Sequence, residues 1–317
     1  MNTDKTLGVD IGYGFTKTFN SAGEKKFPTA VTKTVPESTF REIHPVIVND
    51  SQFLVGDDAM IEGKGLIETR HTGFVRSDAW LAVLGYALFI NDFNPAQNAG
   101  AILVMGIPPG EYSNESVNDI RESIKSTTIV YRSKEFSFHN TSIKLIPQGA
   151  GIFFHHISFS PEDFWKNVAV IDIGHYTVDM VYFHGGKYVE GVTQTTPLGV
   201  SLILDNIKRE FARKYHFAIS QEQAYHLLVR GNIIVCEEPY ALDNLPDLVS
   251  NHCAELSGLI NNFLDNLPQK PQVGLVGGGG VLVLNGNLKV KYKLKVVNNP
   301  AQANSIGYWQ YARRVKT

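Results

Sequence analysis

One short phrase occurs twice in this sequence, and a duplicated phrase indicates a duplicated fold. The first copy reads Val-Asp10-Ile-Gly-Tyr-Gly-Phe-Thr-Lys17, and the second reads Ile-Asp172-Ile-Gly-His-Tyr-Thr-Val-Asp179. Each copy has an apolar strand, at 7–11 or 168–173, that leads through an aspartate into a turn, and a second strand follows at 15–20 or 177–184. A single copy of so short a motif is compatible with an ordinary hairpin. Two copies in phase favour a common function.

The turns have the composition of phosphate-binding loops. Glycine adopts backbone conformations closed to other residues, so a glycine turn can aim consecutive N–H groups at anionic oxygens. At His175 and Tyr176 only the backbone is needed, and we expect their side chains to be incidental. The turn residues predicted to bind phosphate are Gly12, Tyr13, Gly14, Phe15, Gly174, His175, Tyr176 and Thr177.

Charged residues stand at the same places in both copies. Asp10 and Asp172 end their strands close to where a polyphosphate would lie, and a carboxylate repels phosphate. A hydrated Mg²⁺ held through water by the two aspartates is therefore the natural interpretation. Lys17 supplies a point charge for the β- or γ-phosphate. The second copy has Asp179 at the place of Lys17, so we predict that the two halves are not equivalent.

A third glycine element follows later in the chain. The segment 272–276, Gln-Val-Gly-Leu-Val, leads into Gly277–Gly280 and then into the apolar run 281–284, which predicts a buried strand, a bare turn and a short helix. Without side chains at Gly277, Gly278 and Gly279, a flat or bulky ligand can approach the backbone closely. Four glycines alone are more often a flexible loop. Their place after a strand favours a binding role.

With these elements in this order, the chain resembles the actin superfamily nearly from end to end. Pro147-Gln148-Gly-Ala-Gly151 and Ala303-Asn304-Ser-Ile-Gly307-Tyr match its two connecting helices. Segments 107–112, 197–201 and 304–307 are similar to the ParM/StbA plasmid-segregation actins and to short archaeal actin-like proteins. The resemblance implies an α/β, ribonuclease H-like duplicated, two-domain ATPase fold with a nucleotide cleft between the domains.

The resemblance also implies domain boundaries. Domain I is expected at 1–150, with a small outer subdomain at about 31–75, and a C-terminal helix at 301–317 completes it. Domain II is expected at 151–300, with a helical insert at about 220–267. Local patterns predict helices at 76–91, 113–126 and 199–215, and a strand at 100–106. Ser113 is placed to cap its helix, and Ser220-Gln-Glu-Gln223 resembles a capping box.

Two further site residues follow from the family. Gln148 stands where actin-like proteins place a Gln or Glu that orients the attacking water, although a glutamine at a helix start is also compatible with a purely structural role. Lys208 is expected to reach the base or ribose as a lysine on this helix does in some relatives, and a solvated helix lysine is the alternative. ATP or GTP with Mg²⁺ is the implied ligand.

Four lysines alternate with apolar residues near the end of the chain. Lys289, Lys291, Lys293 and Lys295 fall on one side of a period-two pattern that predicts a strand. One interpretation is an edge strand kept soluble by charge. The other is a contact for an acidic partner, such as the next subunit or an adaptor.

Composition limits the partners and the compartment. A formal charge of −2 gives no global field toward nucleic acid or an anionic membrane, so no membrane contact is expected and any DNA contact is expected to go through an adaptor protein. Cys236 and Cys253 have no metal-ligand spacing, and we expect both to be buried in a reducing environment. No apolar run has the length of a signal peptide or a membrane span, which predicts a cytoplasmic protein.

The function predicted from these features is a nucleotide-driven, filament-forming ATPase with slow, polymer-stimulated turnover, which segregates plasmid DNA through an adaptor. Another bacterial or archaeal cytoskeletal filament is a variant of the same prediction. A small-molecule kinase or phosphatase on the same core would need a substrate-facing carboxylate, for which we find no motif. A chaperone-type ATPase would need a separate substrate domain.

Overall fold

The computed structural model describes residues 5–36, 42–62, 64–71, 73–98 and 100–314. The chain divides into two units, each with a hydrophobic core of its own. Unit 1 comprises Met1–Pro161 and Gln302–Thr317, and unit 2 comprises Glu162–Ala301. The boundary between the units lies just after the end of helix α4 (Ala150–Phe159), whereas the boundary predicted from the sequence lies at the start of this helix.

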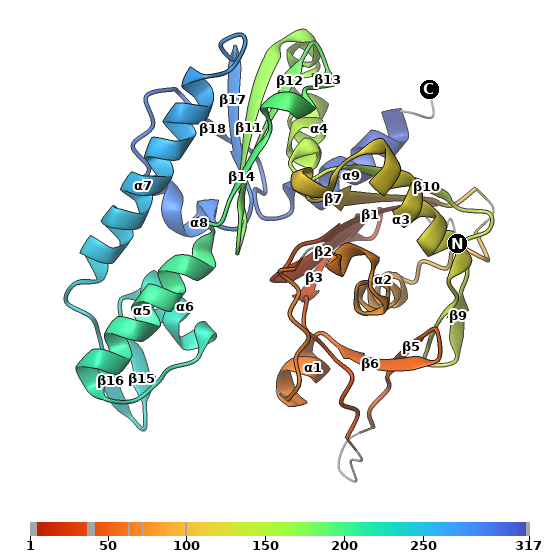
Figure 1. Ribbon diagram of the computed structural model, residues 1–317, viewed down its shortest axis with the longest axis horizontal. Coiled ribbons are helices and arrows are strands. Elements are labelled where there is room, and N and C mark those ends of the chain that lie inside the picture. The colour runs from red at the N-terminus through yellow and green to blue at the C-terminus, as the bar shows by residue number, and fades with distance from the viewer. Residues whose placement is uncertain (1–4, 37–41, 63, 72, 99, 315–317) are drawn as a thin grey trace. The chain divides into compact units, whose positions relative to one another are not determined.

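Each unit is built on a mixed sheet with the same order and direction of strands (Figure 1). The strands in unit 1 are, in spatial order, β10 (Ser142–Pro147), β7 (Ile102–Ile107), β1 (Thr6–Ile11), β2 (Phe15–Asn20) and β3 (Gly23–Pro28). In unit 2 they are β18 (Lys295–Val296), β17 (Val273–Gly277), β11 (Asn167–Ile173), β12 (Val178–His184) and β13 (Lys187–Tyr188), and β14 (Gln194–Thr196) also pairs with β12. In both sheets the first three of these strands are parallel and the remaining pairs are antiparallel. The duplicated phrase therefore forms the same hairpin of a duplicated sheet.

A second sheet in unit 1 draws on two distant parts of the chain. Its strands, in order, are β4 (Val31–Thr32), β6 (Ser51–Val55), β5 (Val46–Val48), β8 (Ile129–Tyr131) and β9 (Lys134–Phe136). Helix α1 (Asp57–Glu62) follows β6. The segment 31–75 thus supplies three of the strands, and residues 129–136 supply the others. Helix α2 (Asp78–Ile90) packs on this sheet at Gly85, where a Cβ atom would collide with Ile129 and crowd Val46.

Side-chain caps begin the predicted helices of unit 1. The Ser77 hydroxyl accepts a hydrogen bond from the Trp80 N–H at the start of α2. Helix α3 (Asn114–Ser126) begins after Ser113, whose hydroxyl accepts from the Ser116 N–H, so the predicted cap is confirmed. Each of these bonds satisfies an N–H group that the first helical turn leaves without a partner.

Helices α4 and α9 (Ala303–Arg314) cross at two glycines. A Cβ atom at Gly307 would overlap the carbonyl group of Gly151, so the two backbones touch directly. The rings of Phe154 and Tyr311 pack 4.7 Å apart further along the crossing. Helix α9 also lies on β1, where Gly8 leaves room for the Ser305 carbonyl. Residues from the end of the sequence therefore complete unit 1.

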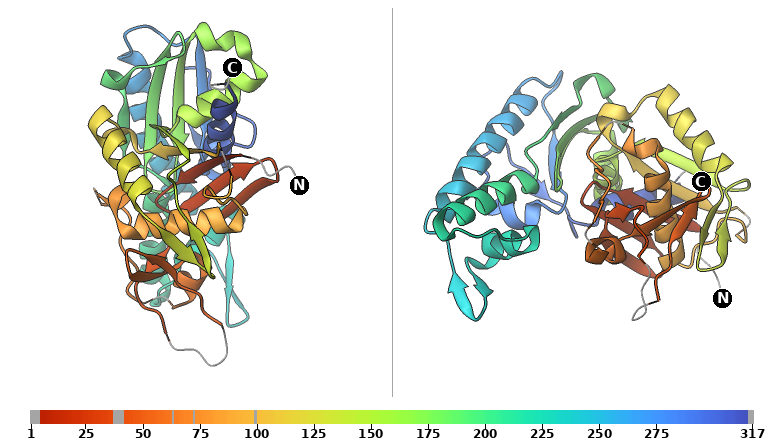
Figure 2. Two further views of the ribbon diagram at one scale, coloured as in Figure 1. Left: turned by 90° about the vertical axis from the view of Figure 1, so that its right-hand side faces the viewer. Right: turned by 60° about the horizontal axis from the view of Figure 1, so that its bottom comes forward.

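Unit 2 contains the helices α5 (Val200–Tyr215), α6 (Gln221–Arg230), α7 (Leu245–Asp265) and α8 (Val281–Leu284). Ser220 and Gln223 form the predicted capping box at the start of α6. Hairpin β15–β16 (Ile233–Val235 and Glu238–Tyr240) interrupts the segment predicted as a helical insert, and Figure 2 shows it extending beyond α5 and α6. Cys236 lies exposed in its turn, so the predicted burial of this residue is wrong, whereas Cys253 is buried as predicted.

The predicted lysine strand is also wrong over most of its length. Of the segment 288–296, which we call the lysine segment, only Lys295–Val296 pairs as a strand. The rest lies along α7, where the Ser257 hydroxyl accepts from the Lys289 backbone N–H and the side-chain Oδ1 of Asn261 accepts from the Lys291 backbone N–H, both at 2.8 Å. Four residues of helix rise about 6 Å, nearly the span of two extended residues. Side chains that are four residues apart on α7 therefore lie level with every second residue of the lysine segment and can bond to its backbone.

Burial in the lysine segment keeps the predicted alternation. The lysines are exposed, and the intervening apolar residues pack against the core of unit 2. Asp265, one further turn along α7, accepts from Lys291 Nζ at 3.0 Å and from the Tyr292 hydroxyl at 2.7 Å. The period-two pattern thus indicated the buried side correctly, but a helix takes the place of the neighbouring strand.

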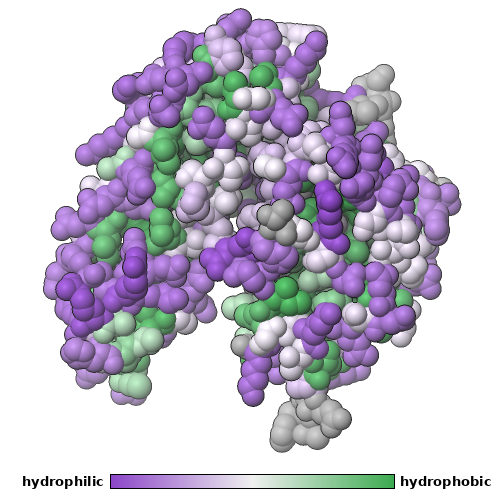
Figure 3. All heavy atoms as spheres, viewed as in Figure 1, coloured by the Kyte–Doolittle hydropathy of each residue, from purple (hydrophilic) through white to green (hydrophobic). Residues whose placement is uncertain are grey.

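Short 3-10 turns complete the fold at Phe74–Arg76, Pro109–Glu111, Pro161–Trp165, Glu190–Val192 and Asn285–Asn287. Hydrophilic side chains cover most of the periphery of the face shown in Figure 3, and hydrophobic ones show mainly between the elements. None of the helices within the described residues combines the length and the apolar character needed to cross a membrane.

Candidate functional site

The first hairpin brings three predicted site residues together in unit 1. Asp10 is the second-last residue of the fully buried strand β1, and Lys17 lies directly opposite it on β2. Lys17 Nζ is 3.6 Å from Asp10 Oδ2, and Gln148 Nε2 donates to Asp10 Oδ1 at 3.5 Å. Asp10 and Gln148 are 3% and 8% exposed, so both polar groups are withdrawn from bulk water. The hairpin therefore carries a buried carboxylate between a cation and an amide.

The charge on Asp10 is incompletely compensated. Burial raises the pKa of Asp10 above its ordinary value, while Lys17, and to a smaller extent Asn304 and Gln148, act to lower the pKa. Since burial is the largest of these effects, the ionised carboxylate is less stable here than in water. A cation bound at this carboxylate would offset that penalty.

Gln148 is fixed by the connection from β10 to α4. Its backbone N–H donates to the Ile107 carbonyl at 2.8 Å, and its side-chain amide also donates to the Ile11 carbonyl at 3.4 Å. Gly149 then adopts a left-handed backbone conformation (φ 85°), which favours glycine, and α4 begins. The Gly149 N–H donates to Asn304 Oδ1 at 3.2 Å. Asn304 is a site residue that the sequence analysis placed only in a connecting helix.

The second hairpin is closed mainly by its backbone. The Gly174 N–H donates to the Thr177 carbonyl at 2.9 Å, which makes the tight turn. The first residues of α5 donate back to the turn, because the N–H of Val200 reaches the Gly174 carbonyl at 3.3 Å and that of Ser201 reaches the His175 carbonyl at 2.6 Å. This approach requires Gly199, where a Cβ atom would meet the backbone of the turn. The turn and the start of α5 thus form one unit.

Two carboxylates replace the ion pair in this hairpin. Asp172 and Asp179 lie directly opposite each other on β11 and β12, and both are buried. Like charges in such a cross-strand pair repel each other. Asp179 accepts from the Thr195 hydroxyl at 2.6 Å and from the Thr177 hydroxyl at 3.4 Å. These hydroxyls stabilise a carboxylate where the first hairpin has Lys17, and Thr195 is a residue that the sequence analysis missed.

The glycine turn after β17 wraps around the end of β11. Gly277 pairs with Asp172, the Gly278 N–H donates to the Pro300 carbonyl at 2.8 Å, and the Gly280 N–H donates to the Ile173 carbonyl at 2.8 Å. Gly278 has φ 87°, and a Cβ atom there would run into Ile173 and Asp172. Around Gly279 the space is open. The predicted strand, turn and short helix are confirmed, and the turn offers bare backbone beside Asp172.

Two of the predicted site residues have side-chain partners near the second hairpin and on α5. The ring of His175 is not incidental, because the Gln221 amide of α6 donates to His175 Nε2 at 2.8 Å and so ties the second turn to α6. Lys208 lies on α5 with its ammonium group 3.5 Å from Asp205 Oδ1 on the same helix. This pairing with a surface carboxylate is compatible with the alternative of a solvated helix lysine, and the predicted contact with base or ribose stays a prediction.

The predicted site residues thus form two clusters, one in each unit. The cluster in unit 1 comprises Asp10, Gly12, Tyr13, Gly14, Phe15, Lys17 and Gln148. The cluster in unit 2 comprises Asp172, Gly174, His175, Tyr176, Thr177, Asp179, Gly277, Gly278 and Gly279. Lys208 lies on α5 outside both turns.

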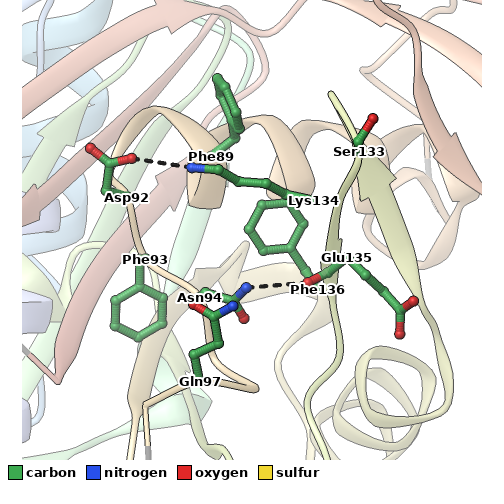
Figure 4. A pocket seen from close by; sticks show the side chains of 9 residues that line it. All are labelled: Phe89, Asp92, Phe93, Asn94, Gln97, Ser133, Lys134, Glu135 and Phe136. Carbon is green, nitrogen blue, oxygen red and sulfur yellow. Dashed lines mark hydrogen bonds and ion pairs between the residues drawn. The ribbon is translucent and has the colours of Figure 1, made fainter.

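A separate cavity of about 340 Å³ lies in unit 1 at the end of α2 and the β8–β9 hairpin (Figure 4). Lys134 Nζ is 3.5 Å from Asp92 Oδ1 across it, and Asn94 Nδ2 donates to the Glu135 carbonyl at 3.3 Å. The lining residues are Phe89, Asp92, Phe93, Asn94, Gln97, Ser133, Lys134, Glu135 and Phe136. Two pairs of its lining residues are thus joined to each other, and it shares no residue with the two clusters.

Sequence families match both halves of the chain. Residues 8–151 match the family described as actin like proteins, N terminal domain. Residues 170–290 match the family described as archaeal actin homologue MreB-like, C-terminal. A comparison with curated protein sequences found no match.

Solved structures show the same fold over nearly the whole chain. The archaeal actin homolog Ta0583 is 19% identical, with 98% of this chain and 99% of that chain covered and a TM-score of 0.80. ParM in a 15-stranded filament from Clostridium botulinum is 22% identical, with coverages of 99% and 100% and a TM-score of 0.79. Bacillus thuringiensis ParM with AMPPNP is 15% identical, with both coverages at 98% and a TM-score of 0.68.

The duplicated sheets, the two hairpins and these matches define the α/β actin-like fold. The chain is an actin-like protein, with an N-terminal and a C-terminal domain that each contain a mixed sheet and helices. The resemblance and the fold class expected from the sequence are confirmed.

Proposed function

We propose that this protein is an ATPase that binds Mg-nucleotide through the two hairpins and assembles into filaments. One observation carries the proposal: a buried carboxylate, Asp10, lies just before a glycine turn and beside both a lysine and a glutamine. The turn supplies N–H donors, the lysine supplies charge, and the glutamine amide supplies a group that can orient water.

Nucleotide binding is supported by the structures of similar proteins. Ta0583 is known in complex with ADP, and Bacillus thuringiensis ParM is known with AMPPNP. In this chain the turn residues 12–15 and 174–177 would bind phosphate, and Gly277–Gly279 would accept the adenosine. GTP is a second substrate to test, since these contacts are largely made by the backbone.

The residues present fit a hydrated Mg²⁺. Asp10 and Asp172 are buried carboxylates, and burial raises the pKa of Asp10, so a divalent cation would relieve an existing penalty. Each hairpin would supply one carboxylate, through water. The metal would neutralise charge that develops on the phosphates.

Gln148 would orient the attacking water during hydrolysis. Its amide contacts Asp10 and the Ile11 carbonyl, and a neutral amide can position water but cannot remove its proton. The contribution is therefore one of orientation, and slow turnover is expected. Contacts made in the polymer would stimulate it.

Filament formation is supported by the ParM structure that is a 15-stranded filament. We propose self-assembly driven by nucleotide, plasmid segregation through a DNA-binding adaptor as the cellular role, and the cytoplasm as the location. Another bacterial or archaeal cytoskeletal filament is the alternative, because nothing in the two clusters depends on the cargo. The exposed lysine segment would contact an acidic partner, either the next subunit or the adaptor.

Sedimentation tests the proposal directly. The wild-type protein should pellet with Mg-ATP or Mg-GTP and with a non-hydrolysable analogue, and only the hydrolysable nucleotides should give phosphate release and later disassembly. Asp172→Ala is the control that should need a higher nucleotide concentration to assemble. A wild-type protein that binds nucleotide tightly, releases phosphate and stays monomeric at all concentrations would instead support a small-molecule kinase or phosphatase.

A further inference from the structure

A row of three charged residues crosses the first hairpin and its neighbouring strand. Asp10 on β1 lies directly opposite Lys17 on β2, and Lys17 lies directly opposite Lys26 on β3. Directly paired residues project from the same face of a sheet. Lys26 therefore shares the face of the two residues that the proposed function assigns to nucleotide binding.

The position of Lys26 is unfavourable for the folded protein alone. Like charges directly opposite each other on neighbouring strands are destabilising. Lys17 has a carboxylate partner in Asp10 at 3.6 Å, which leaves the row with one positive charge in excess. Partial desolvation, and then the nearby Lys17, lower the pKa of Lys26. An anionic ligand on this face would turn the repulsion into attraction.

The ammonium group of Lys26 is held at the turn. Its Nζ atom lies 4.0 Å from the centre of the Phe15 ring, a cation–π contact, and Phe15 is the residue at which the glycine turn ends. The side chain remains accessible to solvent. The neighbouring Lys25 behaves differently, because its Nζ atom donates to the Ile90 carbonyl at the end of α2. Two consecutive lysines of β3 thus have different surroundings.

We propose that Lys26 is a second cation for the nucleotide polyphosphate, acting with Lys17 on the terminal phosphate groups. This inference rests on the proposed nucleotide binding and adds to it a residue that makes affinity depend on the number of phosphates. Lys17 is partly neutralised by Asp10, so Lys26 supplies the net positive charge of the row. The ring of Phe15 keeps the ammonium group near the turn before the ligand arrives.

Calorimetric titration with Mg-ATP and Mg-ADP tests this role in wild type, Lys26→Gln, Lys26→Arg and the matched control Lys25→Gln. A lost charge-assisted contact is worth about tenfold in affinity. We expect Lys26→Gln to weaken ATP binding by about that factor and ADP binding less, Lys26→Arg to restore ATP binding, and Lys25→Gln to bind ATP as the wild type does.

Thermal unfolding without nucleotide separates binding from folding. Lys26→Gln removes the repulsion from Lys17, so its melting temperature should equal or exceed that of the wild type. Equal ATP affinities in Lys26→Gln and Lys25→Gln would overturn the inference while leaving the proposed function intact. A wild-type protein that binds neither nucleotide would overturn the proposed function itself.

Discussion

Hairpins β1–β2 and β11–β12 place an aspartate at the same position of the same kind of sheet, but the residue opposite that aspartate differs. In the first hairpin it is Lys17, which forms an ion pair with Asp10. In the second it is Asp179, which Thr195 and Thr177 hold by hydrogen bonds. The same hairpin backbone therefore carries the row Asp10, Lys17 and Lys26 in unit 1, and the two carboxylates Asp172 and Asp179 in unit 2.

The two copies differ in what surrounds their turns. Beside the first turn stand Lys17 and, from the connection between β10 and α4, Gln148, to which the proposed function assigns phosphate binding and the orientation of water. The second hairpin instead couples its turn to two helices, through Val200 and Ser201 of α5 and through Gln221 of α6. The first turn therefore lies beside charged and amide side chains, whereas the second is tied by hydrogen bonds to the starts of two helices.

The largest expected effect comes from replacing the glutamine beside the first hairpin, Gln148, and comparing it with Gln221 beside the second. Gln148→Ala should keep nucleotide binding and assembly but slow phosphate release by about ten- to a thousandfold, because a water-orienting group is lost. Filaments should then persist longer. Gln221→Ala is the matched control, and its rate per assembled subunit should stay near that of the wild type. Unchanged phosphate release in Gln148→Ala would show that this side chain is structural.

The next effect compares the two aspartates. Asp10→Ala and Asp172→Ala should each weaken Mg-nucleotide affinity by about ten- to a hundredfold, the usual loss when a partner of a metal's ligand shell is removed. Titrations with and without Mg²⁺ measure the effect, and the metal dependence should be lost along with the affinity. Circular dichroism controls for the fold. Wild-type affinity in both variants would exclude the metal role.

A smaller effect concerns stability and pH in the protein without nucleotide. Burial raises the pKa of Asp10 above its ordinary value of 3.8, so the folded state binds the proton more tightly than the unfolded state does. Wild-type stability therefore falls as the pH rises through the raised pKa. Asp10→Asn cannot ionise, so its melting temperature should exceed that of the wild type near neutral pH, and the gap should narrow toward pH 4. A gap that widens on acidification would contradict this sign.

The smallest effect lies outside both hairpins, in the lysine segment. Lys289→Glu with Lys293→Glu should raise the critical concentration for assembly by about two- to tenfold without changing nucleotide affinity, since exposed ion pairs are individually weak. Wild-type assembly should also weaken with added salt. The same charge change at the exposed residues Lys64 and Lys187 is the control. Normal assembly of the first double variant across a salt series would leave the segment without a polymer contact.

The sequence was sufficient for features that depend on neighbouring residues. Both hairpins, the glycine turn and the caps at Ser113 and Ser220 were predicted because turn chemistry and capping act within a few positions. The repeated phrase also identified the duplicated sheets. Its two copies lie in the same register position, where side-chain alternation leaves little freedom.

Partners distant in the sequence could not be predicted in this way. Gly149 and Asn304 are 155 residues apart, and the sequence around either residue does not predict a contact with the other. The hydroxyl of Thr195 and the amide of Gln221 are ordinary surface groups until the fold places them beside Asp179 and His175. The strand predicted for the lysine segment was wrong for another reason. Every second residue of an extended chain is buried whether the chain lies beside a strand or along a helix.

The crossing of α4 and α9 at Gly151 and Gly307 has a consequence for biosynthesis. Unit 2 is continuous in sequence, whereas unit 1 needs residues 302–314. A ribosome that has translated residues 1–301 has therefore completed unit 2, but the first hairpin still lacks the helix that supports β1 and supplies Asn304. Under the proposed function, a nascent chain would lack part of its nucleotide site until residues 302–314 are made. This order of synthesis would keep unfinished chains on a polysome from joining filaments.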